Sequence, residues 1–160
     1  MKTVTFLLRL TASLFIVACF IQTQIASASG MATSDLLVLA EGNNSMAQRV
    51  MGERFATGTY GVNKNMNQAV FWWQKAAERG DVMAQYYLGQ IYRRGVVVLQ
   101  DWVKAHMWFS LAETSNSKAA PAQYKKVAEN DRKATEANMT PEQIKAAQAL
   151  AQEWRETHKK

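Results

Sequence analysis

Residues that could carry chemistry are few in this chain, and none has the spacing of an active site. The two histidines, His106 and His158, lie far apart and form no H-x-x-x-H pair, and the one cysteine is Cys19. A zinc site needs three or four such ligands close together. The chain has no G-x-S-x-G sequence and no nucleophile with a histidine placed to act as its base. We therefore expect no catalytic residue and no bound metal.

Two further patterns are better explained as a turn and a helix end. The Gly-Thr-Tyr-Gly sequence at 58–61 follows an expected helix and lacks the lysine of a phosphate-binding loop. Glu78 and Asp81 are close in sequence, but they flank Arg79 at a helix end, whereas acid–base pairs work in a sheltered cleft. The sequence predicts a protein that is not an enzyme and needs no cofactor.

The elements that carry these residues are repeated. Met-Ala-Gln opens a segment at 46–48 and again at 83–85, an interval of 37 residues, and each opening is followed by glycines at the same two offsets. A period of this length is typical of stacked helix hairpins, in which each repeat buries its apolar face against the next.

The copies predict helices at 45–57 and 66–79, and again at 82–94 and 102–113, with Asn116 ending the last one in a left-handed conformation. The second helix of each copy has apolar residues at the i, i+3, i+4, i+7 spacing of one buried face. Large aromatic residues are expected to pack against small ones on the neighbouring helix. The residues expected to form this repeated core are Ala47, Gly52, Gly58, Ala69, Trp72, Trp73, Ala76, Ala84, Leu88, Gly89, Tyr92, Gly95, Ala105, Trp108, Phe109 and Ala112.

Three further helices are expected outside the two copies. Residues 36–41 resemble the end of another second helix and would cover the open end of the first copy. A helix is expected at 121–137, with an apolar face formed by Ala120, Tyr124, Val127, Ala128 and Ala134. Another begins after Thr140, where Thr-Pro-Glu-Gln has the form of a capping box.

The first 28 residues have the character of a secretory signal peptide. A basic start precedes an apolar run at 10–21 that is too short to cross a bilayer, and Ala-Ser-Ala at 26–28 is a typical cleavage sequence. Cleavage after Ala28 would give a periplasmic or secreted protein without a transmembrane span. Because the residues before Cys19 also fit the bacterial lipoprotein pattern, a lipid anchor at Cys19 is the alternative.

The charge of the chain excludes one class of partner. Its formal net charge is +6, from 19 basic and 13 acidic residues that are spread along the sequence. Proteins that bind nucleic acid concentrate one sign of charge on one face. We therefore expect no nucleic-acid partner.

The repeated segment resembles the Sel-one-like repeat family, which is related to tetratricopeptide repeats. The signature is A-Q-x-x-L-G-x-x-Y-x-x-G, a loop, and D-x-x-K-A-x-x-W-x-x-x-A-A-x-x-G, and the second copy follows it from Ala84 to Ala112. The chain departs from the family at Val97, where a second loop glycine is usual. The resemblance implies an exported bacterial member with an all-α fold, a short right-handed solenoid of helix hairpins closed by a C-terminal helix pair. It also implies that the protein acts as an adaptor for other proteins and has no catalytic activity of its own.

In such stacks the first helix of each hairpin lines the concave surface. Some positions of these helices are expected to be buried, and Tyr87 is assigned to them. The remaining positions form a polar stripe that contains tyrosine and arginine, which are enriched at binding hot spots. The residues expected to contact a protein or peptide partner are Arg49, Glu53, Thr57, Tyr86, Gln90, Arg93 and Arg94. Self-association is the alternative for so short a solenoid.

The predicted organisation has five parts, and the predicted function is protein–protein interaction in the bacterial cell envelope. The parts are a signal peptide (1–28), a partial N-terminal repeat (29–45), repeat one (46–81), repeat two (82–116) and C-terminal capping helices (117–160).

Overall fold

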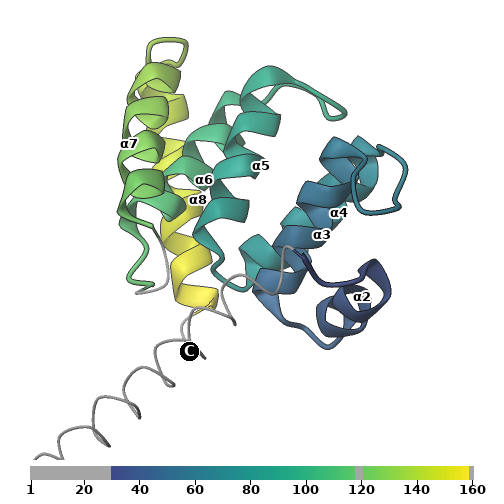
Figure 1. Ribbon diagram of the computed structural model, residues 1–160. Helices are drawn as coiled ribbons and strands as arrows, with labels where there is room; N and C mark the ends of the chain where they lie inside the picture. The colour runs from purple at the N-terminus through teal and green to yellow at the C-terminus, as the bar shows by residue number, and fades with distance from the viewer. Residues whose placement is uncertain (1–29, 118–120, 159–160) are drawn as a thin grey trace, which may run out of the picture.

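The computed structural model describes residues 30–117 and 121–158, and the expected signal peptide and Cys19 lie outside them. The described residues form seven helices and no strand, which confirms the all-α prediction (Figure 1). None of these helices is long and apolar enough to cross a membrane. The helices are α2 (Thr33–Glu41), α3 (Ser45–Thr57), α4 (Met66–Glu78), α5 (Val82–Arg94), α6 (Trp102–Thr114), α7 (Ala122–Glu136) and α8 (Pro141–Thr157).

The two sequence copies fold as the hairpins α3–α4 and α5–α6. Each of these four helices begins at an Asn or Asp whose side chain accepts a hydrogen bond from a backbone N–H of the first turn. The first helix of each hairpin ends at a glycine, Gly58 or Gly95, with φ of 74° and 68°. Such left-handed residues end a helix without a steric penalty when they lack a Cβ.

The predicted left-handed end at Asn116 is wrong. The helix α6 is followed by Ser115, whose φ of −59° and ψ of 133° are extended. Gly80 and Asn43, at the corresponding positions of the preceding repeats, do have positive φ, of 80° and 68°. They make the tight turn into α5 and α3, whereas the chain after α6 takes a longer path to Ala122 and needs no such turn.

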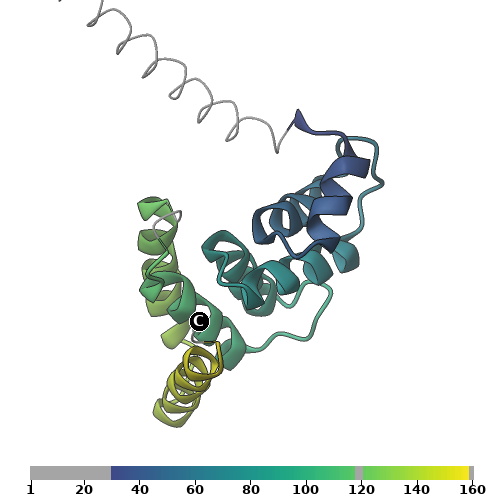
Figure 2. The same cartoon turned by 90° about the horizontal axis from the view of Figure 1, so that it is seen from below.

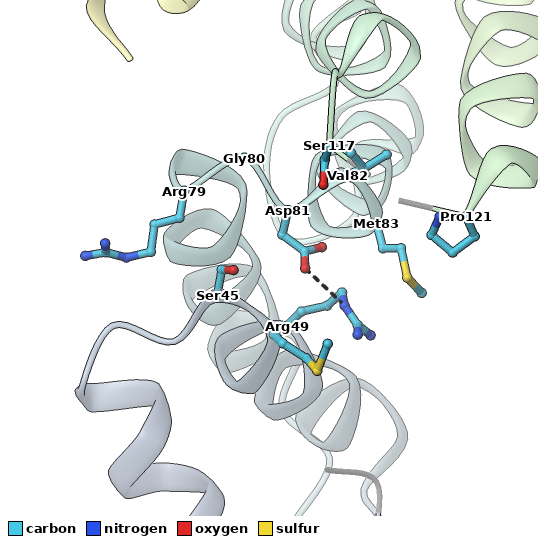
Figure 3. Close-up of a pocket in the computed structure, with 10 residues that line it drawn as sticks. Ser45, Arg49, Arg79, Gly80, Asp81, Val82, Met83, Ser117 and Pro121 are labelled. Carbon is cyan, nitrogen blue, oxygen red and sulfur yellow. Dashed lines mark hydrogen bonds and ion pairs between the residues drawn. The ribbon is translucent and has the colours of Figure 1, made fainter. Parts of the chain in front are cut away.

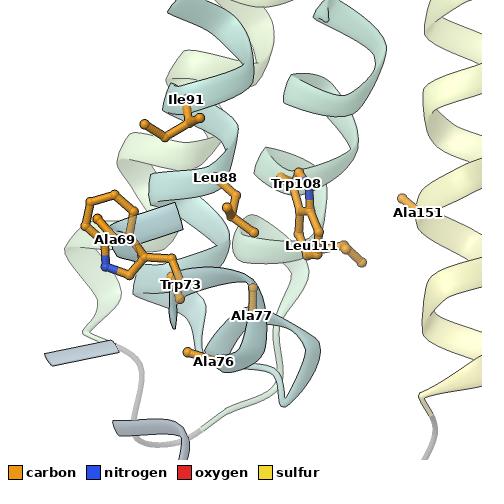
Figure 4. Packing of buried hydrophobic residues seen from close by; sticks show 10 residues of the cluster. Ala69, Trp73, Ala76, Ala77, Leu88, Ile91, Trp108, Leu111 and Ala151 are labelled. Carbon is orange, nitrogen blue, oxygen red and sulfur yellow. The ribbon is translucent and has the colours of Figure 1, made fainter. Parts of the chain in front are cut away.

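The core forms where aromatic rings of one helix meet small residues of another (Figure 4). A Cβ added to Gly52 would lie 2.4 Å from the Trp73 ring, and one added to Gly89 would lie 2.5 Å from the Phe109 ring. Real Cβ atoms do not approach other atoms so closely, so that each ring occupies the space that glycine leaves. The same pair therefore recurs in both hairpins, and it fixes how closely their two helices approach.

Most residues predicted for the repeated core are buried, but Gly58 is exposed and Gly95 half-buried, because both lie at helix ends. Each alanine among them, and also Leu88 and Phe109, is at most 2 % exposed, and Trp72, Trp73 and Trp108 are between 4 and 6 % exposed. Tyr92 is half-buried.

The Ala-Gln pair that is repeated at the start of each copy also has a structural reason. The Gln48 amide Nε2 donates to the Ala40 carbonyl at 2.9 Å, and Gln85 Nε2 donates to the Ala77 carbonyl at 3.2 Å. Each buried glutamine thus adds a second hydrogen bond to a carbonyl near the end of the preceding helix, which also accepts a backbone N–H from the turn that follows, of Asn43 or Gly80. This bond joins each hairpin to the element before it, including α2 before the first copy.

The C-terminal helices α7 and α8 both pack on α6. The predicted apolar face of α7 is confirmed at Ala128, which is buried, and Ala120 lies outside the described residues. It is wrong at Val127, which is 42 % exposed, and at Ala134, which is exposed, whereas Thr135 is buried. This happens because the inward face of α7 is largely polar and meets charged residues of α5 and α6. The capping box of α8 is confirmed by reciprocal bonds between Thr140 and Gln143.

Candidate functional site

The helices α3, α5 and α7 follow one another along the inner side of a curved stack, called here the α3–α5–α7 face (Figure 2). All seven residues that the sequence predicts as partner contacts belong to two of these helices, three to α3 and four to α5. The structure adds residues of α7 that the sequence did not indicate. The α3–α5–α7 face is therefore the candidate binding site.

One polar cluster joins α3 to α5. The Arg49 guanidinium pairs with Asp81 at 3.3 Å (Figure 3). It also pairs with Glu53 at 2.6 Å, and the Tyr87 hydroxyl donates to Glu53 at 3.3 Å. Although burial opposes the charge, Glu53 and Asp81 raise the pKa of Arg49. Burial raises the pKa of Asp81, against the hydrogen bond from Ala84 N–H and the charge of Arg49. The cluster thus places one cation between two carboxylates, which leaves one formal negative charge.

A second polar cluster joins α5 to α7 through Asp131. Its carboxylate accepts from the Tyr86 hydroxyl at 3.0 Å and from Gln90 Nε2 at 2.6 Å, and it forms an ion pair with Arg93 at 3.6 Å. Burial, followed by the bond to Asp131, raises the pKa of the Tyr86 hydroxyl. Asp131 was missed because α7 lies outside the repeat, although its spacing of seven from Tyr124 places both on one side of a helix.

The predicted contact residues thus fall into two groups. The first group forms hydrogen bonds or ion pairs within itself or with the next helix and is called here the polar floor: Arg49, Glu53, Tyr86, Gln90 and Arg93. Thr57 and Arg94 are exposed at the other end of their helices, where the Thr57 hydroxyl donates to the Glu53 carbonyl at 2.8 Å. The structure does not bring these last two together with the polar floor.

Three tyrosines form an aromatic cluster between the helices. The Tyr124 ring lies edge-on to Tyr86, 5.8 Å away, and to Tyr87, 6.4 Å away. Tyr87 is only half-buried, contrary to its assignment to the core, because its ring stacks on Trp73 while its hydroxyl reaches Glu53. Beside the cluster lies a pocket of about 300 Å³, which is lined by Tyr86, Gln123, Tyr124 and Val127.

A second pocket, of about 180 Å³, lies where α3, α5 and α7 begin (Figure 3). Its lining includes Met46, Arg49, Asp81, Met83 and Pro121. Met83 and Pro121 each lie one helical turn before a tyrosine of the first pocket, so that the two pockets follow one another between α5 and α7. Methionine adapts its shape readily, and tyrosine offers both an apolar ring and a hydroxyl. This lining suits the binding of a peptide or protein surface.

The histidines contribute to packing. His106 is buried, and its Nε2 lies 2.9 Å from Glu136 across the α6–α7 contact, while His158 stacks on the Trp154 ring. Across the residues that the structure describes, no group of three His, Cys, Asp or Glu side chains could hold a metal ion.

These features define a class of protein: a solenoid of helix hairpins. A family model described as "Sel1 repeat" matches residues 45–81 and 82–117. The chain therefore carries two Sel1 repeats, at residues 45–81 and 82–117. Sel1-like repeat proteins generally mediate protein–protein interactions and are typically not catalysts.

The fold is similar to that of a solved bacterial protein. The crystal structure of a protective antigen present in uropathogenic Escherichia coli strains, which displays an SLR fold, matches with a TM-score of 0.69 and 32% sequence identity. The match covers 79% of this chain and 26% of the antigen. The chain thus spans about a quarter of the length of that protein. A comparison with curated proteins gave no match.

Proposed function

We propose that this protein is a non-catalytic interaction module of the bacterial cell envelope that binds a peptide or protein segment on its α3–α5–α7 face. The observation that carries the proposal is the pair of neighbouring pockets beside the tyrosine cluster. The exposed apolar side chains at their rims, Met46 and Val127, are 44 % and 42 % exposed. They supply apolar area that a partner could bury.

The polar floor explains how such a site could bind despite its small size. The side chains of Arg49, Tyr86 and Arg93 are already held by carboxylates, so that binding would order few of them further. Groups that are fixed in advance lose little conformational entropy when a complex forms. We infer that affinity would come from apolar contacts in the pockets and selectivity from the polar floor.

The envelope location rests on the sequence and is supported by the likeness to a bacterial antigen. Cleavage after Ala28 would release the domain, whereas lipidation at Cys19 would tether it. Fractionation of cells that produce the Cys19→Ser variant distinguishes the released form from the tethered form. If the variant moves from the membrane to the soluble periplasmic fraction, the tethered form is correct.

The binding site is tested by two matched substitutions on different sides of the stack. Val127→Asp adds a charge at the rim of the tyrosine pocket without removing any bond of the polar floor, and we expect about a tenfold or greater loss of affinity for a crosslinked native partner. Leu150→Asp changes an equally exposed residue on α8, 39 % exposed, and should bind normally. Equal affinity of both variants would show that the partner binds elsewhere.

A further inference from the structure

The α5–α6 loop presents apolar side chains to solvent in a way that folding alone does not require. Leu99 is 91 % exposed, and Val96 and Val97 are 41 % and 47 % exposed. Val98, between them, instead packs against the core cluster of Ile91 and Trp108. The loop therefore turns one valine inward and displays three aliphatic side chains outward.

The backbone of this loop is held in an unfavourable conformation. Val97 has a φ of 61°, in the left-handed region that β-branched residues rarely adopt. Bonds on both sides keep it there, since Gln100 Nε2 donates to the Arg93 carbonyl at 2.8 Å and the Asp101 N–H donates to the Tyr92 carbonyl at 3.0 Å. Strained residues of this kind gather at functional sites, where the surrounding structure enforces them.

The neighbouring α3–α4 loop lies at the same end of the stack (Figure 1). It presents Tyr60, which is 58 % exposed, and the exposed Lys64. Together with Arg94 at the base of the second loop, these residues and the three aliphatic ones form a surface called here the loop edge.

The charge of the loop edge favours an anionic surface. Neither 55–77 nor 82–100 contains an aspartate or glutamate. The acid nearest the second loop, Asp101, caps α6 and pairs with Lys104 at 3.5 Å. The edge therefore has an apolar tip, one exposed tyrosine, and cations behind them.

We propose that the loop edge binds the surface of an anionic lipid bilayer, with Leu99 and its neighbouring valines entering the boundary between headgroups and acyl chains. Interfacial binders combine aliphatic side chains with flanking Lys and Arg, and tyrosine is enriched at the depth of the headgroups. Three aliphatic side chains give weak and reversible binding, which suits a contact that orients a protein already held near a membrane. The inference does not depend on the partner that the α3–α5–α7 face binds.

The test uses the full chain with an environment-sensitive fluorophore at one position. In a Cys19→Ser background, Leu99→Cys carries the label, and Val38→Cys on α2, whose valine is 68 % exposed, is the matched control. Vesicles of phosphatidylglycerol and phosphatidylcholine should raise the emission at position 99 about twofold or more, whereas position 38 should not respond. Adding Lys64→Glu and Arg94→Glu, or using phosphatidylcholine alone, should remove most of the rise.

Three results would overturn the proposal. The first is an unchanged emission at position 99 when anionic vesicles are added. The second is an equal rise at positions 99 and 38, which would place the membrane contact in another part of the chain. The third is a rise at position 99 that depends on protein concentration without vesicles, which would identify a second copy as the occupant.

Discussion

The Asp131 carboxylate of α7 accepts a hydrogen bond of 3.0 Å from the Tyr86 hydroxyl of α5. This bond connects a helix outside the two repeats to the repeat beside it. The same carboxylate accepts a hydrogen bond from Gln90 and forms an ion pair with Arg93, so that one residue of α7 holds three side chains of the candidate face. The shape of the tyrosine pocket therefore depends on α7 being held in place.

Removing this carboxylate should loosen α7. We expect Asp131→Ala to lower the free energy of unfolding by about 1–3 kcal/mol, because it leaves partly buried donors without an acceptor. Relative to the unchanged protein, the substitution should accelerate hydrogen exchange of the α7 amides more than that of the α3 amides. Glu129→Ala is the control, since Glu129 lies on the same helix and pairs only with exposed lysines. Unchanged exchange in α7 would contradict a positioning role for Asp131.

The glycine at 89 should not tolerate a methyl group. Because its Cβ would lie 2.5 Å from the Phe109 ring, Gly89→Ala is expected to destabilise the protein by about 1–3 kcal/mol in denaturant unfolding. A smaller side chain opposite should relieve the clash. The Gly89→Ala, Phe109→Leu double variant should therefore lose less stability than the two single changes added together. Strict additivity would contradict a direct contact.

The repeat explains why so much of the fold could be predicted from the sequence. The pairing of Gly89 with Phe109 recurs as Gly52 with Trp73, and each element is marked by a capping residue or an end glycine. Two copies of one pattern exclude alternative assignments of helices and turns that a single copy would leave open. The prediction failed at Asn116, where the pattern ends and the chain follows a different path.

The α5–α6 loop offers a test of strain at Val97. Asparagine adopts positive φ more easily than a β-branched residue does, so we expect Val97→Asn to stabilise the protein by about 1 kcal/mol. Thermal unfolding measures this as a higher Tm. Val96→Asn, at a similarly exposed neighbour, should leave the Tm nearly unchanged. Equal shifts for both variants would show that polarity, and not the backbone conformation, is responsible.

The tyrosine cluster predicts a dependence of stability on alkaline pH. Burial raises the pKa of Tyr86 and of Tyr87 above the ordinary value of 10.0. Since the folded state then holds protons that the unfolded state releases, this contribution is complete below about pH 10 and is lost as the pH rises further. Absorbance titration should show fewer tyrosines ionising near pH 10 in the folded protein than in denaturant. The Tyr86→Phe, Tyr87→Phe double variant should reduce the dependence, and an unchanged slope would contradict the assignment.

The candidate site could be predicted only in part. The spacing of Arg49, Tyr86 and Arg93 along helices places them on one face, and the structure has them there. Their partners could not be read from the same spacing, because Asp131 comes from a helix without a repeat pattern and Asp81 also caps α5. Helical periodicity gives the direction in which a side chain points, but not which distant side chain meets it.

The most direct test of binding at the α3–α5–α7 face is photocrosslinking in living cells. Benzoylphenylalanine would replace Gln123, which lines the tyrosine pocket and is exposed, or Phe71 on α4, which is 48 % exposed. We predict a discrete crosslinked partner from position 123 and none from position 71. The same adduct from both positions, or an adduct from position 71 alone, would contradict the assignment of this face as the binding site.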